Sequence, residues 1–417
     1  MSQSTQYKLK EIARIVNGST PSTSCDNYYD GDIIWLTPRD LSEQKSKYIE
    51  KGSRNITEDG YNSCSTQLIP PYSLLLTSRA PIGLLAINKV ECCTNQGFKN
   101  LILDKSKVDV DYLYYYLKFH IKEIEALGAG TTFKEVSKSS LENYVVSLPS
   151  VEEQRIVARI LSDIDSKIAI DRSISSNLSR LARQIYDYWF VLFDFPNIEG
   201  KPYQSSGGQM AYNDILKRVL PFGWSVKPIK EICSIRRGAS PRPIDDYMDE
   251  THTGKPWLKI SDATVNSSPF VVKIKEYIIP EGINKSVEVD EGTLVVTNSA
   301  TPGLPKFIHV NACVHDGWLV LTDYPQECKY YLYYTIEDMR AKLERMASGS
   351  IFKNLRTDYL ENYFCMLPSS EILKAFNHKI SPIMERLLSS EKEICALTQQ
   401  RDILLPLLMN GQISNRK

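Results

Sequence analysis

The sequence has no excess of either charge and no long hydrophobic run. Fifty Lys and Arg residues balance fifty Asp and Glu residues over 417 positions, so the formal net charge is zero. A neutral chain has no overall field that attracts nucleic acid, and any such contact must come from local basic clusters. No apolar run approaches the roughly 20 residues that cross a bilayer, so we expect no membrane contact.

Metal-binding and redox patterns are also missing. The nine cysteines include an adjacent pair, Cys92-Cys93, and otherwise lie scattered without zinc-ligand spacing. An odd number of cysteines, with no signal peptide, predicts reduced thiols and a cytoplasmic location. The five histidines form no ligand pair at helical spacing. We therefore expect no bound metal.

The familiar cofactor loops are absent or incomplete. Ile69-Pro70-Pro71-Tyr72 resembles the core of amino-methyltransferases, but Ile69 cannot accept a hydrogen bond from a target amino group. Gly128-Ala129-Gly130 lacks the third glycine of a dinucleotide or S-adenosylmethionine loop, because Phe133 stands there. The couple His315-Asp316 favours a satisfied polar pair over a catalytic dyad. We therefore expect no catalytic residue, although an unrecognised nuclease site stays an alternative.

The stretch from Val151 to Trp189 predicts one long helix with a heptad seam. Apolar residues recur at alternating steps of four and three, which keeps a narrow stripe facing a partner helix. Ser150 and Glu153 form a capping box just after Pro149. The seam positions are Val157, Leu161, Ile164, Ile168, Asp171, Ser175, Leu178, Ala182, Ile185 and Trp189.

A second seam near the end of the chain supplies the partner. Its spacing matches the first seam at an offset of 219 residues, including a polar position at Ser390 that matches Asp171. We expect the two helices to pair antiparallel, and Pro382 to kink or break the second one. The second seam comprises Leu373, Phe376, Ile380, Ile383, Leu387, Ser390, Ile394, Leu397, Arg401, Leu404 and Leu408.

The same offset, within a few residues, runs through the rest of the chain, so the chain is an internal repeat. The matched landmarks are Gly18 with Gly238, Pro21 with Pro241, Trp35-Leu36 with Trp257-Leu258, Asp40 with Asp262, Thr77, Ala80 and Gly83 with Thr297, Ala300 and Gly303, Gly97-Phe98 with Gly317-Trp318, Tyr112 to Tyr115 with Tyr331 to Tyr334, and Leu141 to Tyr144 with Leu360 to Tyr363. A period this long excludes a solenoid.

The predicted fold class is α+β, with two mainly β domains in tandem, each followed by a long helix. Short apolar runs separated by Gly, Pro, Asn and Ser predict the strands, and one helix is expected over Val110 to Ala126. The predicted divisions are a first domain at 1–149, a first helix at 150–193, a turn-rich linker at 194–223, a second domain at 224–368, and a second helix with a tail at 369–417.

These features resemble the specificity subunit of type I restriction-modification systems over the whole chain. The distinctive residues are Leu148-Pro149, Glu153-Gln154, Ile156, Leu161, Ile164-Asp165, Tyr188-Trp189-Phe190, Phe193 to Pro196, Gly200 to Tyr203, Pro221 and Gly223-Trp224. The second repeat departs from the family pattern, because Glu371-Ile372 replaces the Glu-Gln pair after Leu367-Pro368.

The resemblance implies a non-catalytic subunit that recognises double-stranded DNA. Two target-recognition domains would each contact one part of a bipartite target, and the paired helices would hold them apart like a ruler. Partners would be two modification (methyltransferase) subunits and the restriction/translocase subunits. S-adenosylmethionine, ATP and Mg are expected on those partners, and no cofactor on this chain.

Candidate DNA-binding residues are polar residues on loops that recur in both repeats with different side chains. In the first repeat they are Ser19, Thr20, Ser22, Thr37, Arg39, Ser78, Arg79, Asn95, Gln96, Lys99, Thr131, Thr132 and Lys134. In the second they are Arg236, Arg237, Ser240, Arg242, Lys259, Ser261, Asn298, Ser299, His315, Asp316, Ser350, Lys353 and Asn354. Asp40 and Asp262 are identical in both repeats, which favours a structural role for them.

A different class of function remains open. The chain could be a coiled-coil scaffold that binds only proteins, and the zero net charge favours this alternative. The basic residues Arg236, Arg237 and Arg242 count against it.

Overall fold

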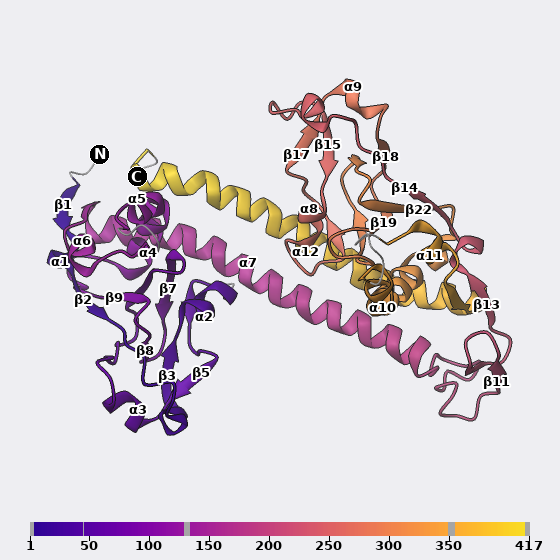
Figure 1. Cartoon of the computed structure of the whole chain (residues 1–417), viewed down its shortest axis with the longest axis horizontal. Coiled ribbons are helices and arrows are strands. Elements are labelled where there is room, and N and C mark those ends of the chain that lie inside the picture. Colours follow the sequence, from indigo (N-terminus) through magenta and orange to yellow (C-terminus); the bar gives the residue numbers. More distant parts are fainter. Residues whose placement is uncertain (1–3, 45, 129–133, 349–354, 413–417) are drawn as a thin grey trace. The chain divides into compact units, whose positions relative to one another are not determined.

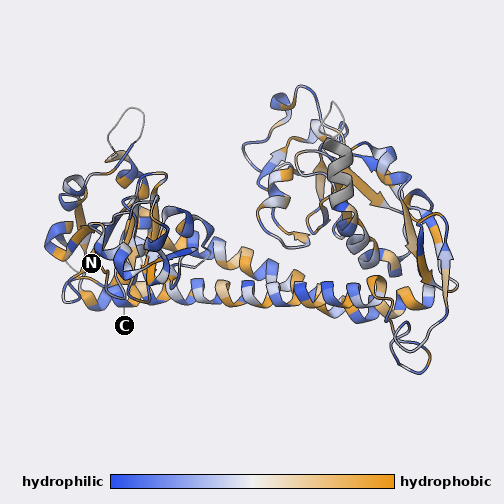
Figure 2. Ribbon diagram, turned by 60° about the horizontal axis from the view of Figure 1, so that its bottom comes forward, coloured by the Kyte–Doolittle hydropathy of each residue, from blue (hydrophilic) through white to orange (hydrophobic). Residues whose placement is uncertain are grey.

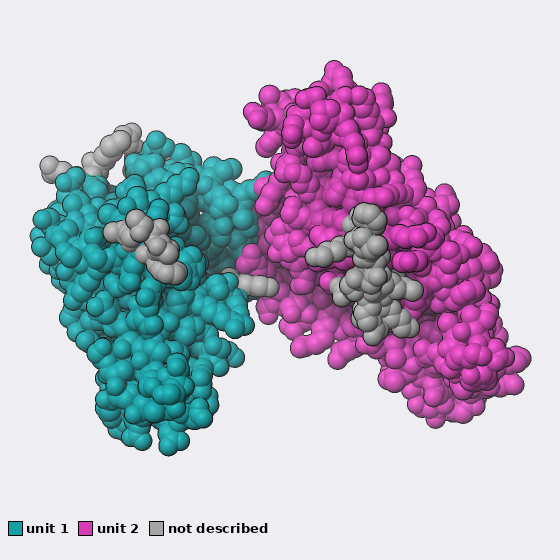
Figure 3. Space-filling model, in the orientation of Figure 1, with its two compact units in different colours: residues 1–170, 396–417 teal, residues 171–395 magenta. Residues whose placement is uncertain are grey.

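A computed structural model describes residues 4–44, 46–128, 134–348 and 355–412, with the side chains of 341–348 left out. The chain divides into two compact units (Figure 3), one of residues 1–170 and 396–417 and the other of residues 171–395. Each unit therefore contains one globular domain and one part of each long helix. The α+β prediction is confirmed.

The domain of unit 1 is built on a five-stranded sheet in the order β2-β9-β6-β7-β4. These strands are Ala13–Asn17, Phe98–Leu103, Leu74–Ser78, Ile82–Asn88 and Tyr48–Ile49. A smaller sheet has the order β5-β3-β8, formed by Arg54–Ile56, Tyr29–Leu36 and Cys93–Thr94. The chain enters and leaves the domain through one antiparallel pair, β1 (Thr5–Lys8) with β10 (Val145–Leu148).

Short helices complete this domain. They are α1 (Leu9–Ile12), α2 (Pro38–Glu43), α3 (Glu58–Asn62), α4 (Val110–Phe119), α5 (Ile121–Ala126) and α6 (Lys138–Glu142), with a 3-10 turn η1 at Asp26–Tyr28. The single helix predicted over 110–126 is therefore wrong, because it ends at His120. The ring of His120 packs 4.5 Å from that of Tyr116 and bonds Glu123 at 2.7 Å, which holds this residue outside helical geometry.

Unit 2 repeats the same architecture, as the internal repeat predicts. Its larger sheet has the order β14-β22-β19-β20-β16, formed by Ser234–Arg237, Trp318–Thr322, Thr293–Thr297, Pro305–Ile308 and Phe270–Val271. Its smaller sheet has the order β17-β15-β21-β18, formed by Glu276–Ile278, Lys255–Leu258, Ala312–Val314 and Val287–Val289. The strands β13 (Ser225–Pro228) and β23 (Phe364–Leu367) pair as β1 and β10 do.

The helices of this domain are α8 (Ile260–Thr264), α9 (Pro280–Ile283), α10 (Lys329–Ser348) and α11 (Thr357–Glu361). Three 3-10 turns lie at Ile229–Glu231, Ile244–Tyr247 and Gln326–Cys328. Hydrophobic residues concentrate in the strands of both domains and polar residues on the outer faces of the helices (Figure 2). This distribution is expected when sheets pack a core.

The segment predicted as a linker is an ordered part of unit 2. It forms a hairpin of β11 (Met210–Asn213) and β12 (Arg218–Pro221). The ring of Phe195 stacks on Tyr203 at 4.6 Å and on Trp224 at 5.4 Å. The segment therefore contributes aromatic side chains to the core, which a turn-rich composition does not reveal.

The two long helices are α7 (Val151–Tyr186) and α12 (Ser370–Met409) (Figure 1). In unit 1 the first half of α7 shares a core with the end of α12, where Leu161 packs with Leu404 and Leu408. In unit 2 the second half of α7 shares a core with the start of α12, where Tyr186 lies 6.3 Å from Phe376. The helices therefore run antiparallel, as predicted.

The predicted seam positions are all buried or half-buried on these helices. In the first helix they include Val157, Leu161, Ile164, Ile168, Leu178 and Ile185; in the second they include Phe376, Ile380, Ile383, Leu387, Leu397 and Leu404. Asp171 and Ser390 are both fully buried at the polar position. The predicted capping box is confirmed, because Glu153 accepts hydrogen bonds from the Ser150 backbone and hydroxyl at 3.2 and 2.9 Å.

Helix α7 ends differently from the prediction, because a π-helical turn over Asp187–Val191 follows Tyr186. This wider turn accompanies burial of Trp189 and Phe190 against unit 2's aromatic core. π-turns insert one extra residue into a helix and redirect the side chains that follow.

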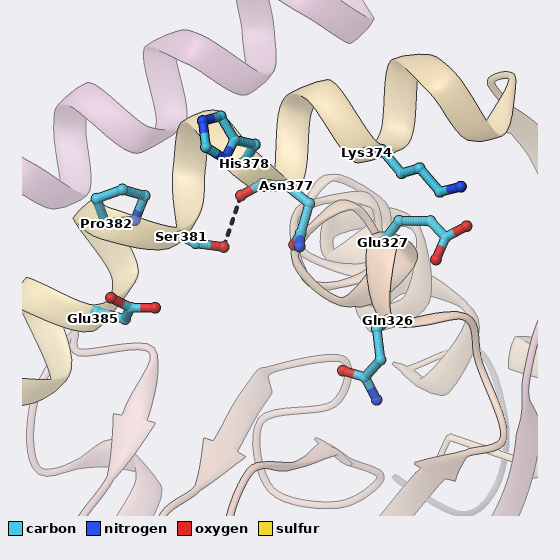
Figure 4. Close-up of a pocket in the computed structure, with 8 residues that line it drawn as sticks. All are labelled: Gln326, Glu327, Lys374, Asn377, His378, Ser381, Pro382 and Glu385. Atoms are coloured by element: carbon cyan, nitrogen blue, oxygen red, sulfur yellow. Dashed lines mark hydrogen bonds between the residues drawn. The ribbon is translucent and has the colours of Figure 1, made fainter.

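The alternative of a break at Pro382 is wrong, since α12 is one helix from Ser370 to Met409. The alternative of a kink stays a prediction. Proline removes the hydrogen bond of its own N–H to the His378 carbonyl. One residue earlier, the Ser381 hydroxyl donates to the Asn377 carbonyl oxygen at 2.7 Å (Figure 4). Pro382 lies on the exposed side of the helix, where its ring lines an open groove with Glu327, Lys374 and His378.

Candidate nucleic-acid interface

The loop after β2 lies directly against the turn before β9 in unit 1. A Cβ added to Gly18 would lie 2.0 Å from the carbonyl oxygen of Asn95. The Ser19 amide donates to the Thr94 carbonyl at 2.9 Å. Only glycine allows this approach, so Gly18 fixes where the polar residues that follow it are presented.

The same contact recurs in unit 2 at the matching residues. A Cβ on Gly238 would lie 2.1 Å from the carbonyl oxygen of His315, and the Ala239 amide donates to the Val314 carbonyl at 3.2 Å. We call this place in each unit the loop junction. It consists of residues 18–20, 78–81, 95–97 and 134–136 in unit 1, and of residues 238–242, 298–301, 315–317 and 355 in unit 2.

The turn within each junction is closed by different side chains in the same way. Asn95 Oδ1 accepts the Gly97 amide at 2.9 Å, and His315 Nδ1 accepts the Gly317 amide at 2.8 Å. Burial lowers the pKa of His315, although the charge of Asp316 opposes this shift. A neutral imidazole is the form that can accept this bond.

A third loop enters each junction with a common backbone shape. The hydroxyls of Thr77 and Thr297 accept amides of Leu84 and Leu304, each at 2.9 Å. Ala80 and Ala300 have left-handed φ values of 50° and 58°, so the two loops share this unusual backbone conformation.

A fourth segment joins at the same point. The Val136 amide donates to the Ser78 carbonyl at 3.0 Å, and the Leu355 amide donates to the Asn298 carbonyl at 2.6 Å. The predicted residues just before these segments, Thr131, Thr132, Ser350, Lys353 and Asn354, lie outside the described residues.

The tips of the junctions differ in chemistry. In unit 1 the Thr20 hydroxyl bonds the side-chain oxygen of Gln96. In unit 2 the Ser240 hydroxyl donates to Asp316 Oδ1 at 2.8 Å. One junction therefore carries a neutral pair of side chains and the other a carboxylate, on the same scaffold.

Asp316 lies close to the basic residues of its junction. Arg237 donates from Nε to the Asp316 carbonyl at 2.8 Å, and the guanidinium groups of Arg237 and Arg242 lie 3.8 and 3.7 Å from Asp316 Oδ2. Burial would raise the pKa of Asp316, but the hydrogen bond from Ser240 and the charge of Arg237 lower it overall. Both arginines remain exposed, with side-chain exposures of 51% and 82%.

Three candidate residues are buried, and their contact with DNA stays a prediction. Ser78 is fully buried and Asn298 is 2% exposed, while Lys99 is 6% exposed. Lys99 pairs with Glu135 at 3.1 Å, and the Asn298 amide donates to the Asp316 carbonyl at 3.0 Å. These side chains support the junction from inside.

Other candidates lie outside the junctions or serve other contacts. Thr37 donates to Asp40 Oδ2 at 2.6 Å, and Lys259 donates from its amide to Asp262 Oδ2 at 3.0 Å, so both aspartates cap short helices as predicted. The other contacts are Arg39 with Glu43 at 2.8 Å, Arg236 with the Glu288 carbonyl at 3.1 Å, and Lys259 with Glu276. Ser22 and Ser261 are exposed.

The remaining candidates lie within the junctions. Arg79, half-buried, lies 3.8 Å from Glu135; Lys134 is exposed and Ser299 is half-buried. Glu135 itself was not predicted, although it contacts Ser78, Arg79 and Lys99. The repeat gives no signal for it, because Asn354 stands at the matching position.

Within the described ranges, no group of three or more His, Cys, Asp or Glu side chains is placed to hold a metal ion. All nine cysteines are free. No helix in the described part of the chain is long and apolar enough to cross a membrane.

The sequence matches the family model described as the type I restriction modification DNA specificity domain, at residues 1–180 and again at 221–400. The chain belongs to this family, and the two matched segments correspond to the two repeats.

Individual relatives agree. The chain is 30% identical over 416 residues to the MjaIX type I restriction enzyme specificity subunit of Methanocaldococcus jannaschii, covering 97% of this chain and 92% of that protein. It is 24% identical to the HindI specificity subunit of Haemophilus influenzae, covering 68% and 72% of the two chains. The fold is similar to a crystal structure of the type I system S subunit from M. genitalium, with a TM-score of 0.64, 16% identity and coverage of 98% and 96%.

Proposed function

We propose that this chain is the DNA sequence-specificity subunit of a type I restriction-modification complex. One observation carries this proposal: each unit presents the same loop junction, yet the side chains at its tip differ. A common scaffold with different tips suits two domains that recognise different base sequences, because hydrogen-bonding groups that match one base edge mismatch another.

The target proposed here is asymmetric and bipartite. The domain at 1–149 recognises one part and the domain at 224–368 the other, while α7 and α12 set the length of the spacer. Arg237 and Arg242 supply positive charge in unit 2, and Lys134 and Arg79 supply it in unit 1. Their neighbours Asp316 and Glu135 offset part of this positive charge.

The proposed partners dock on the long helices. Several apolar side chains on these helices are exposed although they lie outside the seam, including Ile156, Ile160, Ile170, Leu181 and Ile403. Exposed apolar side chains on a helix face favour a protein partner. We assign this surface to two modification subunits, with restriction subunits joining them.

The chain itself is proposed to be non-catalytic and cytoplasmic. S-adenosylmethionine, ATP and Mg would bind to the partner subunits, since this chain carries no recognisable loop for a nucleotide or for S-adenosylmethionine. Labelled methyl groups should enter DNA only when the modification subunit is added. Methylation by the purified chain alone would refute this assignment.

The rival function is a scaffold that binds only proteins. It is favoured by the pairing of junction arginines with Asp316, which lowers the local positive field. A gel-shift titration with duplex DNA and the modification subunit separates the two functions. The proposal predicts binding that weakens steeply with salt, whereas a scaffold gives no shift at any salt concentration.

A further inference from the structure

Each globular domain rests on the long helices of its own unit at equivalent positions. We call these helix positions seat 1 and seat 2, and an offset of 219 residues relates them. Seat 1 consists of Gln154, Ser162 and Asp165 on α7 with Arg401 and Asp402 on α12. Seat 2 consists of Leu373, Ser381 and Met384 on α12 with Ala182 and Arg183 on α7.

Seat 1 is polar at its centre. The Tyr115 hydroxyl of the domain donates to Asp165 Oδ2 at 2.6 Å, and Arg401 donates to Asp165 Oδ1 at 3.0 Å. The side chains of Asp165 and Arg401 are only 18% and 20% exposed. One carboxylate thus joins the domain to both helices.

Two further polar contacts fix the same domain. Lys47 lies 2.6 Å from both Asp111 and the Ser162 hydroxyl, with its side chain 4% exposed. Gln154, fully buried, accepts the Asp109 amide at 2.9 Å and donates to the Lys107 and Pro149 carbonyls at 3.1 and 2.9 Å. Buried hydrogen-bonded groups of this kind tolerate little change of position.

Seat 2 is apolar at the corresponding centre. Leu373 is 3% exposed, and Met384 and Ala182 are fully buried. They share one hydrophobic core with Tyr331 and Tyr334 of the domain. The Tyr334 hydroxyl, equivalent to that of Tyr115, meets the Met384 sulfur at 3.8 Å in place of a carboxylate.

The charges at the edge of the two seats are reversed. In unit 2, Arg183 of the helix lies 3.6 Å from Glu337 and also pairs with Asp338 of the domain. The equivalent residues in unit 1 are Asp402 on the helix and Lys118 on the domain. Burial and the charge of Arg401 lower the pKa of Lys118, while the charges of Asp165 and Asp402 oppose this shift. Moving the first domain to seat 2 would bring Lys118 to Arg183 and leave the Tyr115 hydroxyl without its carboxylate.

We propose that seats 1 and 2 form a matching code that assigns each domain to its own end of the helices. Gln154, Asp165, Arg401 and Asp402 accept the first domain; Leu373, Met384, Ala182 and Arg183 accept the second. A domain in the wrong seat meets like charges and unmatched polar groups, which binding surfaces use to reject incorrect partners.

The test exchanges domains and seats independently in the full chain. A graft places a second copy of residues 5–148 in place of residues 225–367, on either the natural seat 2 or a converted seat. The converted seat carries Leu373→Gln, Met384→Asp, Ala182→Arg and Arg183→Asp. The two matching controls are the natural chain and the natural second domain on the converted seat.

The expected result is a crossover in thermal unfolding. The graft should gain about 5 °C or more in Tm on the converted seat, while the natural second domain should lose a similar amount there. If the converted seat changes the Tm of both chains in the same direction, the seats do not discriminate and the code is overturned.

If the graft folds on neither seat, a mutant cycle in the natural chain tests whether the seats discriminate between the domains. In the natural chain, Arg183→Asp alone, Glu337→Lys with Asp338→Lys alone, and all three together are compared by Tm. Asp187 lies 2.7 Å from Arg183, so Arg183→Asp also disturbs a contact within α7. The informative quantity is therefore the difference between the Tm loss of the triple variant and the sum of the losses for the helix and domain substitutions made separately. The code predicts that the triple variant regains at least about half of the summed loss of Tm, and purely additive losses contradict it.

The consequence for recognition rests on the proposed function: the code would fix which half of the target lies at which end. The Tm measurements use no DNA and no partner. A failure of the code therefore shows in unfolding, and a failure of the proposed function shows in DNA binding.

Discussion

At the scale of single residues, comparison of the two repeats separates the residues that shape the loops from those that can determine base recognition. Gly18 and Gly238 occupy the same close contact, and Ala80 and Ala300 share a left-handed backbone. Asn95 and His315 instead perform one structural task with different chemistry, since each closes its turn through a side-chain acceptor. Residues that vary at such places can change base recognition without changing the loop.

The lowered pKa of His315 predicts that the stability of the second domain depends on pH. This pKa is lowered from the usual value of 6.5 in the folded protein, mainly by burial, so the unfolded chain binds the proton more tightly. The stability that this group contributes is fully present above pH 6.5 and is lost as pH falls through the folded pKa. His315→Asn should flatten this dependence in urea unfolding from pH 7.5 to 5, because Asn95 shows that asparagine can close the turn.

His309 also has a pKa lowered mainly by burial. Part of the pH dependence of the free energy of unfolding should therefore remain in the His315→Asn variant. His309→Asn is the matched control, and it should leave the part due to His315 in place. A His315→Asn chain with the full natural slope would show that the imidazole does not titrate with unfolding.

Arg237 tests the junction of unit 2 directly. We expect Arg237→Ala to weaken binding of the assembled complex to its target by about 1–3 kcal/mol if the guanidinium contacts a base. Lys273→Ala removes the same charge from an exposed residue after β16 and should cost little beyond a small salt-dependent term. Equal losses for both variants, measured by fluorescence anisotropy, would mean that Arg237 contributes only bulk charge.

At the scale of elements, the seam of the long helices explains both stability and assembly. Burying a Leu or Ile there contributes about 1.5–3 kcal/mol. Leu178 packs against the core of unit 2, and a carboxylate at that place would be desolvated without a partner. Leu178→Asp should therefore lower the Tm and abolish recovery of a complex with the modification subunit.

Leu181 provides the matched control for stability alone, since it lies one turn further on α7 with 44% exposure and belongs to the proposed partner surface. Leu181→Asp should keep the Tm within a few degrees of the natural chain. Differential scanning calorimetry and size-exclusion chromatography report the two effects. A Leu178→Asp chain with the same Tm as the Leu181→Asp chain would contradict the seam.

Elements with a regular pattern could be predicted from the sequence, and those decided by tertiary contacts could not. The heptad steps predict α7 and α12, and the apolar runs predict β6 and β9. The end of α4 at His120 depends on a ring contact and a bond to Glu123 that no periodicity encodes. The hairpin at β11 and β12 forms in a segment whose turn residues mask its aromatic packing.

The candidate site was only partly predictable for the same reason. The repeat correctly selects loops that meet, such as those bearing Thr20 with Gln96 and Ser240 with Asp316. It cannot distinguish an exposed side chain from a buried one, so Ser78, Lys99 and Asn298 were included. The sequence does not identify Glu135, because its contacts with Ser78, Arg79 and Lys99 are made only in the folded chain.

At the scale of the whole molecule, two similar units in one chain present two recognition surfaces, as a dimer does. Unlike the surfaces of a symmetric dimer, these two can carry different side chains. A symmetric dimer presents identical surfaces and suits a palindromic target. Here the junctions carry Thr20 and Gln96 in one unit and Ser240 and Asp316 in the other. The target should therefore consist of two unlike parts.

The most direct test maps the methylated positions in the genome of a host that carries the intact operon. The same map is then made with a chain in which a recognition domain of another relative replaces residues 224–368, with both long helices kept. We predict an asymmetric bipartite target in the first map. In the second map, one part of the target should change, while the other part and the spacer stay the same. A palindromic natural target, or a graft that changes both parts, would contradict the assignment of one part to each domain.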